Sequence, residues 1–199
     1  MSLEHSQKDR PSQTGEELAP TQTVVIRETK ETQVRVALAR TGTELRVDTG
    51  LPFFDHMLGT LARYAGLGLD LHARGDLRHH LMEDVAITLG TALQRITPPT
   101  SARYADRFVP MDEALVHAAL DLGGRAYFVG KLPGRLYTHF FHSLCDHARM
   151  TLHLRLIRGE DRHHLTEAAF KATGLCLREA LVESGAVFST KGSVKLEVT

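Results

Sequence analysis

The sequence has few of the residues and segments that mark several large classes of protein. Its two cysteines, Cys145 and Cys176, are too few for a disulfide framework or a thiolate metal site. No apolar run approaches the roughly 20 residues of a membrane-spanning helix. No G-x-G-x-x-G or G-x-x-x-x-G-K-[ST] segment indicates a dinucleotide site or a P-loop. Because 24 basic residues balance 24 acidic ones, we expect neither nucleic acid nor a membrane as a partner.

What remains is an ordinary globular composition with an unusual number of histidines. The chain has 199 residues, of which twelve are histidine and 42% are hydrophobic, enough for one domain or two small halves. Residues 1–23 have almost no apolar periodicity, which predicts a disordered N-terminal tail. This segment lacks the apolar core of a secretory signal, so we expect a cytoplasmic protein.

Hydrophobic periodicity after the tail predicts an α+β fold. Strands and helices alternate, but the first strands follow one another directly, which favours largely antiparallel sheets with helices on one face. We expect strands over 24–26, 33–38, 44–47, 67–72, 116–122, 126–129 and 151–157. We expect helices over 54–64, 83–96, 140–148 and 165–183, with the prolines after residue 97 ending the second.

An internal repeat divides the ordered chain. R-G-D-L-R-H-H-L-M-E (74–83) and R-G-E-D-R-H-H-L-T-E (158–167) are offset by 84 residues and agree at seven of ten positions. A single histidine precedes each copy, His56 by 23 residues before His79 and His139 by 24 before His163. We therefore expect two duplicated half-domains, 24–109 and 110–199, in each of which a helix opens with H-H-x-x-E.

The H-H-x-x-E pattern is suited to binding metal. On a helix, His79 and Glu83 share a face at i, i+4, and His80 approaches Glu83 at i, i+3. The two adjacent histidines point about 100° apart, so they are better placed to serve two ions than one. His163, His164 and Glu167 repeat this geometry.

Adding the two upstream histidines gives six imidazoles and two carboxylates, which could supply two metals with three histidines and one glutamate each. This donor set suits zinc, copper, iron, nickel or manganese, and octahedral ions would keep positions open for substrate. The other six histidines show no pattern and are expected to be surface or core residues; they are His5, His72, His117, His142, His147 and His153.

Candidate anion-binding residues occur at three places in the sequence. Ser189, Thr190 and Lys191 combine two hydroxyls with an ammonium near the C-terminus, within the second half-domain. Arg107 and Arg125 could bind phosphate through two parallel hydrogen bonds. From sequence alone, a polar turn and surface salt bridges explain these residues at least as well.

Several of these motifs together resemble one family. T-G-L-P-F-F-D-H-M-L, R-H-H-L-M-E-D, M-D-E-A-L, H-F-F, E-D-R-H-H-L-T-E-A-A-F-K-A and S-T-K-G occur in the order found in imidazoleglycerol-phosphate dehydratases, and the match runs from residue 24 to the C-terminus. The resemblance implies a lyase that dehydrates imidazole glycerol phosphate to imidazole acetol phosphate in histidine biosynthesis. It also implies a duplicated fold of the ribosomal protein S5 domain 2-like type, two manganese ions per site, and trimers assembled into a particle of twenty-four subunits with sites between subunits.

The resemblance also implies roles for individual residues. The implied metal ligands are His56, His79, His80, Glu83, His139, His163, His164 and Glu167. One ion would take His79, His139, Glu167 and either His163 or His164, and the other would take His56, His80, Glu83 and the remaining histidine. The implied substrate contacts are Glu31, His56, Arg107, Arg125, Ser189, Thr190 and Lys191. Glu31, Glu83 and Glu167 are the candidate acid–base groups, with Glu31 favoured because it is not a metal ligand.

The chain departs from the family pattern beside the ligands. Thr138 replaces a glutamate before H-F-F, Leu81 replaces a threonine after the first H-H pair, and residues 130–137 form a shortened segment. These changes affect the surroundings of His139.

Two other functions fit the same ligands. A dinuclear hydrolase of phosphate esters would use two metals and an anion clamp. A metal-storage or structural metal protein would have closed sites without the arginine and lysine contacts.

Overall fold

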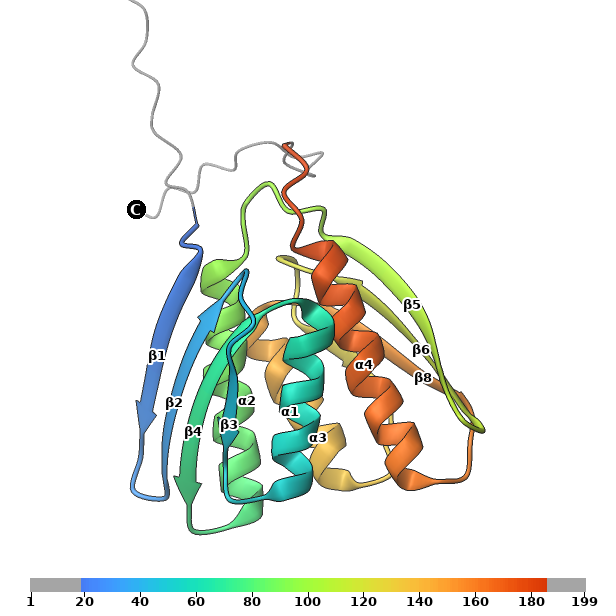
Figure 1. Cartoon of the computed structure of the whole chain (residues 1–199), viewed down its shortest axis with the longest axis horizontal. Helices are drawn as coiled ribbons and strands as arrows, with labels where there is room; N and C mark the ends of the chain where they lie inside the picture. The colour runs from blue at the N-terminus through green and yellow to red at the C-terminus, as the bar shows by residue number, and fades with distance from the viewer. Residues whose placement is uncertain (1–18, 186–199) are drawn as a thin grey trace, which may run out of the picture.

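The first half of the chain forms a four-stranded sheet with two helices on one face. The computed structural model describes residues 19–185 (Figure 1). Its first sheet has the order β1-β2-β4-β3, with only β3 and β4 parallel. The elements are β1 (Gln22–Glu28), β2 (Thr32–Ala39), β3 (Leu45–Asp48), α1 (Pro52–Ala65), β4 (Gly68–Gly75) and α2 (Arg78–Ile96).

The second half repeats this plan element by element. Its sheet has the order β5-β6-β8-β7, and again only the last pair is parallel. The elements are β5 (Tyr104–Met111), β6 (Ala114–Asp121), β7 (Tyr127–Val129), α3 (Arg135–Ala148), β8 (Thr151–Arg158) and α4 (Arg162–Ala180). Corresponding helices have equal lengths, 14 residues for α1 and α3 and 19 for α2 and α4. The expected duplication and α+β class are confirmed.

The two halves join through their helices, which lie between the two sheets (Figure 1). α1 of the first half packs against α4 of the second, and α2 packs against α3. Aromatic rings fill the centre of this contact, where Phe54 of α1, Phe140 of α3 and Phe170 of α4 are buried within 5.5 Å of a neighbouring ring centroid. Burying these large apolar rings is a main source of stability for the joined halves.

Two glycines set how closely the helices approach. A Cβ on Gly90 of α2 would lie 2.8 Å from the carbonyl oxygen of Leu144 in α3. A Cβ on Gly174 of α4 would lie 2.6 Å from the carbonyl oxygen of Leu61 in α1. Both distances are shorter than van der Waals contact, so any larger residue would push the helices apart. Gly90 and Gly174 are themselves related by the 84-residue offset of the repeat.

The expected elements agree with the structure except at a few boundaries and one strand. Helix α2 begins at Arg78 rather than 83, and α4 ends at Ala180 rather than 183. Strand β5 was not expected, because Asp106, Arg107 and Pro110 interrupt its apolar alternation. The strand forms nevertheless because β5 lies at the edge of its sheet, the position at which proline is tolerated.

The junction between the halves also lies elsewhere than expected. A boundary between residues 109 and 110 falls inside β5, whose pairing with β6 runs from Tyr104 to Met111. The second sheet therefore begins at β5, just after the chain leaves α2. At the other end of the first half, β1 begins at Gln22, within the segment expected to be a tail. No helix among the described residues is long and apolar enough to cross a membrane.

The close helix approach predicts an unusual effect of a helical alanine. Gly174→Ala should destabilise the protein by about 1–3 kcal/mol through overpacking, although alanine in a free helix is favoured over glycine by about 1 kcal/mol. Gly59→Ala is the matched control, since a Cβ at this α1 position meets nothing within 4 Å. Urea unfolding of both variants measures the difference. Equal stabilisation by both substitutions would show that the α1–α4 approach is not limiting.

Candidate metal centre

All of the histidines in the duplicated motifs lie near the starts of helices. His56 and His139 are the fifth residues of α1 and α3, and His79 and His163 are the second residues of α2 and α4. The starts of α1, α2 and α4 lie at the same end of the molecule, the lower end in Figure 1. The repeat therefore places its candidate ligands together at one end of the helical layer.

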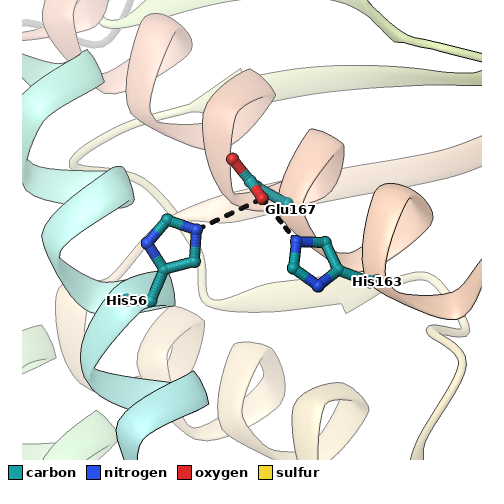
Figure 2. A group of neighbouring side chains, drawn as sticks. All are labelled: His56, His163 and Glu167. Carbon is teal, nitrogen blue, oxygen red and sulfur yellow. Dashed lines mark hydrogen bonds and ion pairs between the residues drawn. The ribbon is translucent and has the colours of Figure 1, made fainter.

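The first group of ligands, the α1–α4 cluster, consists of His56, His163 and Glu167. His163 Nε2 lies 2.9 Å from Glu167 Oε2, and His56 Nε2 lies 3.3 Å from the same oxygen. Figure 2 shows the two imidazoles on either side of the carboxylate. One ligand atom from each side chain lies within 4.8 Å of the others, a spacing that could hold a metal ion.

The second group, the α2–α3 cluster, is the counterpart of the first in the repeat. His79 Nε2 lies 3.5 Å from Glu83 Oε2, and His139 Nε2 lies 3.4 Å from Glu83 Oε1. The imidazole rings of His79 and His139 are stacked, with centroids 4.8 Å apart. Here too the three ligand atoms lie within 4.8 Å of one another.

The helix packing explains which residues meet. Because α1 packs on α4 and α3 packs on α2, each cluster takes one histidine from one half and a histidine with a glutamate from the other. The grouping differs from the implied division of ligands. Glu83 lies with His79 and His139, and Glu167 lies with His56, whereas the resemblance placed these two carboxylates the other way round.

The second histidine of each H-H pair belongs to neither cluster. His80 Nδ1 lies 2.9 Å from Asp76 Oδ1 and 3.5 Å from Glu31 Oε2. His164 Nδ1 lies 2.8 Å from Glu113 Oε2, and its Nε2 lies 3.4 Å from Asp112 Oδ2. Adjacent histidines thus face different partners, as their helical spacing predicts. Hydrogen bonding to these carboxylates raises the pKa of His80 and of His164, and the bond to His164 lowers the pKa of Glu113 to about 2.

Local interactions fix the helix starts that carry the ligands. Asp55 accepts hydrogen bonds from the backbone N–H and the hydroxyl of Thr49, which ties the chain before α1 to its first turn beside His56. Asp161 is the N-cap of α4 and accepts the backbone N–H groups of His163 and His164. These bonds explain the D-H and E-D-R-H-H segments of the sequence.

Glu167 is the most buried of the candidate ligands. Its side chain is 9% exposed, and Lys171 Nζ lies 2.9 Å from its Oε1. Burial alone would raise the pKa of Glu167, but hydrogen bonds from Lys171, His56 and His163 together lower it. Lys171 and Glu167 also line a pocket of about 420 Å³ beside His56. The carboxylate is therefore available in its ionised, metal-binding form.

The donor atoms of both clusters fit a divalent metal. Imidazole and carboxylate groups suit Mn²⁺ and its neighbours in the first transition row. His139 Nε2 is buried and has no hydrogen-bond partner among the described residues, and its 3.4 Å distance to Glu83 exceeds a good hydrogen bond. A buried ring nitrogen that faces a carboxylate without a hydrogen bond is the arrangement expected of a histidine that binds a metal ion.

Glu31 lies in the turn between β1 and β2, near the helix starts. Its side chain is 56% exposed, and its carboxylate lies 3.5 Å from His80. It is therefore close to the H-H-x-x-E segment of its own half and free to contact a bound molecule.

Two of the candidate phosphate ligands, Arg107 and Arg125, are not near the clusters within one chain. Arg107 of β5 is bonded to Glu179, which follows Glu167 along α4 by about 18 Å at 1.5 Å per residue. Arg125 is exposed in the turn between β6 and β7, where its carbonyl accepts a bond from Thr151 at the start of β8. Ser189, Thr190 and Lys191 lie outside the described residues.

The two residues that depart from the family pattern near His139 have structural roles of their own. Thr138 Oγ1 accepts the backbone N–H of Leu132 and so ties the segment before α3 to its first turn, while Leu81 is buried in the core.

Three polar residues of the site are not predicted by the sequence analysis. Asp76, Glu113 and Lys171 each contact a candidate ligand, and Asp76 and Lys171 are four residues from His80 and Glu167. The i, i+4 spacing of these two could have revealed them. Glu113 could have been found only by aligning the β5–β6 turn with the turn that carries Glu31.

Comparison with known proteins agrees with this geometry. The family model described as imidazoleglycerol-phosphate dehydratase matches residues 49–177. An imidazoleglycerol-phosphate dehydratase from Methanoculleus marisnigri is 46% identical over 189 residues, covering 85% of this chain and 97% of that protein. A histidine biosynthesis bifunctional protein from Stenotrophomonas maltophilia is 45% identical, and this chain covers 54% of its length.

Solved structures show the same fold. The structure of the enzyme from Pyrococcus furiosus has a TM-score of 0.77 at 38% identity, covering 85% of this chain and 99% of that one. The structure from Staphylococcus aureus has a TM-score of 0.73 at 31% identity, covering 81% of this chain and 100% of that one. The family model covers the residues that carry the duplicated clusters, and the dehydratase from Methanoculleus marisnigri and both solved structures match along nearly their whole length. The chain therefore belongs to the imidazoleglycerol-phosphate dehydratase family.

Proposed function

We propose that this chain dehydrates imidazole glycerol phosphate to imidazole acetol phosphate in histidine biosynthesis, with two manganese ions as cofactors. The observation that carries the proposal is the pair of equivalent clusters at one end of the helical layer. Each offers two imidazoles and one carboxylate with the spacing that a metal ion needs. Membership of the dehydratase family selects the reaction from those that such a centre could support.

The ligands of the proposed centre come from the duplicated motif. The α1–α4 cluster and the α2–α3 cluster each supply three donors. We assign His80 and His164 as the fourth donors, one for each ion. These two histidines face away from the clusters of their own chain, so the complete sites would lie where two subunits meet. A divalent metal bound there would act as a Lewis acid toward the imidazole of the substrate.

Glu31 is the residue that we assign to proton transfer. The reaction removes a hydrogen from the carbon next to the ring-bearing carbon and a hydroxyl from the ring-bearing carbon, and these leave as water. The enol that remains becomes the ketone by moving one proton. Glu31 is suited to accept the first proton because its carboxylate is exposed beside His80 and is outside both clusters. Glu83 and Glu167, in contrast, are committed to the metals.

The phosphate of the substrate would be held by basic residues of a neighbouring subunit. Within one chain, Arg107 and Arg125 are remote from the clusters, so they can contribute to a site only if a second copy brings them there. Exposed apolar side chains on the edge strands support such an assembly. Val24 and Ile26 of β1 are 51% and 62% exposed, and Tyr104 and Phe108 of β5 are 54% and 59% exposed.

The catalytic proposal is tested by turnover of imidazole glycerol phosphate in the presence of Mn²⁺. The wild-type protein should release the ketone product, and it should not hydrolyse generic phosphate esters. Glu31→Gln should lower kcat by about 10²–10⁴-fold, since it removes the proton acceptor while keeping its shape. Glu44→Gln changes an exposed carboxylate outside the site and serves as the control. Turnover of Glu31→Gln close to that of the wild type would contradict the assignment.

The metal proposal predicts two ions per chain, with a loss for each ligand removed. Dialysis against Mn²⁺ followed by elemental analysis should find a ratio of two in the wild-type protein. His163→Ala, His80→Ala and His164→Ala should each lower this ratio or the affinity by at least about 10-fold. His72→Ala replaces a histidine paired with Asp70 on the first sheet and should keep both ions. Full occupancy in His80→Ala or His164→Ala would exclude those two residues as ligands.

The assembly proposal predicts a large particle built from trimers. Sedimentation velocity of the protein with Mn²⁺ should give a mass many times 22.1 kDa. Phe108→Asp should weaken the assembly because it places a charge on an exposed aromatic surface of β5. A fully active monomer would contradict both the assembly and the sites between subunits.

A further inference from the structure

A partly buried polar network connects helix α2 to the sheet of the first half; Asp84 and Thr32 are buried, while the Arg27 side chain is 40% exposed. Asp84 follows the candidate ligand Glu83 and is 8% exposed. Its carboxylate accepts a hydrogen bond from Arg27 Nε of β1 at 2.8 Å and a second from the hydroxyl of Thr32, the first residue of β2. Thr32 is itself only 3% exposed. None of these three residues belongs to the metal centre described above.

The network continues into the turn that carries Glu31. The hydroxyls of Thr29 and Thr32 lie 3.1 Å apart. Thr29 Oγ1 then accepts the backbone N–H of Thr32 at 2.9 Å and that of Glu31 at 3.1 Å. The carbonyl of Glu31 accepts the backbone N–H of Asp76, just before α2. The backbone of Glu31 is therefore linked through Thr32 to Asp84 and is held on α2.

The second half of the chain provides an internal comparison. The register of the strands aligns Arg27, which pairs with Val34, with Val109, which pairs with Val116. Thr32 corresponds to Ala114, because each begins the second strand of its sheet. Asp84 corresponds to Ala168, because each is the seventh residue of its helix. All three counterparts are buried and apolar, with exposures of 7%, 1% and 0%.

The second half forms the equivalent junction without a polar network. The same junction of helix, strand and turn is filled by apolar side chains in the second half. A buried carboxylate with a charged partner commonly stabilises a fold no better than well-packed apolar residues of similar volume. Stability therefore does not explain why the first half has a polar network at this junction. The residue that the network holds is Glu31, and we look for the explanation there.

The counterpart of Glu31 is held in another way. Glu113 occupies the same place before β6, and its carboxylate is fully engaged. It accepts the backbone N–H groups of Glu160 and Asp161 and lies 2.8 Å from His164 Nδ1. Glu113 is thus fixed through its side chain. Glu31 is fixed through its backbone, and its carboxylate stays 56% exposed, with a longer 3.5 Å approach to His80 Nδ1.

We propose that Asp84, with Thr32 and Arg27, is a positioning residue for Glu31. It anchors the β1–β2 turn through the backbone, so that the Glu31 carboxylate is held at the substrate without being occupied by the bonds that hold it. The inference rests on the proposed role of Glu31 in proton transfer. It assigns the duplicated glutamates different tasks, since Glu31 reacts while Glu113 orients His164.

The test transfers the apolar junction of the second half to the first. The triple variant Arg27→Val, Thr32→Ala and Asp84→Ala should fold, because the second half folds with these residues. It should bind as much Mn²⁺ as the wild type and keep KM within about threefold, while kcat falls by about 10–100-fold, since small misplacement of a reacting group is costly. Amide hydrogen exchange at Glu31 and Thr32 should become faster. Asp84→Asn should lower kcat in the same way but by a smaller factor. This single variant keeps the test decisive if the triple variant does not fold.

Two further variants separate this proposal from its alternatives. Arg35→Val with Asp70→Ala removes an ion pair between β2 and β4 in the same sheet and should leave kcat and the exchange of the turn unchanged. In the Glu31→Gln background, the triple change should cost no further activity, because a positioning residue acts only through the group that it positions.

The outcomes distinguish the two proposals. Near-normal turnover of Glu31→Gln alone would refute the role of Glu31 and this inference with it. An inactive Glu31→Gln together with a fully active triple variant would refute the positioning role alone. Loss of Mn²⁺ from the triple variant would also refute it, since the network would then act on Glu83. A full additional loss in the Glu31→Gln background would show that Asp84 acts elsewhere.

Discussion

The contact between helices of opposite halves is the constraint on which the rest of the structure depends. Gly90 and Gly174 let α2 approach α3, and α4 approach α1, so closely that a Cβ at either position would lie within 3.0 Å of a carbonyl oxygen of the facing helix. This approach brings the first turns of helices from different halves together, and the candidate ligands lie in those turns. Neither half alone could form either cluster, because each cluster takes a histidine from one half and a glutamate from the other. The joining of the halves therefore also assembles the candidate metal centre.

The two halves and the ligand pairs within each helix could be predicted from the sequence, because the repeat contains several histidines and glutamates at fixed spacing. The 84-residue offset revealed the two halves, and the i, i+4 spacing of His79 and Glu83 revealed a ligand pair on one helix face. The partners across the halves could not be predicted in this way. Whether His56 meets Glu83 or Glu167 depends on which helices pack together, and hydrophobic periodicity indicates only that each helix has a buried face.

Strand β5 and the buried residue Asp84 could not be predicted from the sequence either, for a different reason. An edge strand tolerates Pro110 and charged residues, so the alternation that identifies central strands is weak there. The burial of Asp84 could not be predicted, because an acidic residue that follows Glu83 on a helix is normally a surface residue. Its burial against Arg27 and Thr32 depends on the register of β1 and β2, which only the three-dimensional structure defines.

The comparison of the two halves separates what the fold requires from what the chemistry requires. Features kept in both halves, such as the helix lengths, the close glycines and the cluster ligands, serve the joined fold and its two equivalent histidine–glutamate clusters. Features present in only one half break that symmetry. A dehydration needs a proton acceptor at one carbon of the substrate, so two equally free glutamates would serve no purpose. In our proposal, the network around Asp84 and the engaged carboxylate of Glu113 give the duplicated turns different tasks: the first turn presents an exposed Glu31 carboxylate, and the second holds His164.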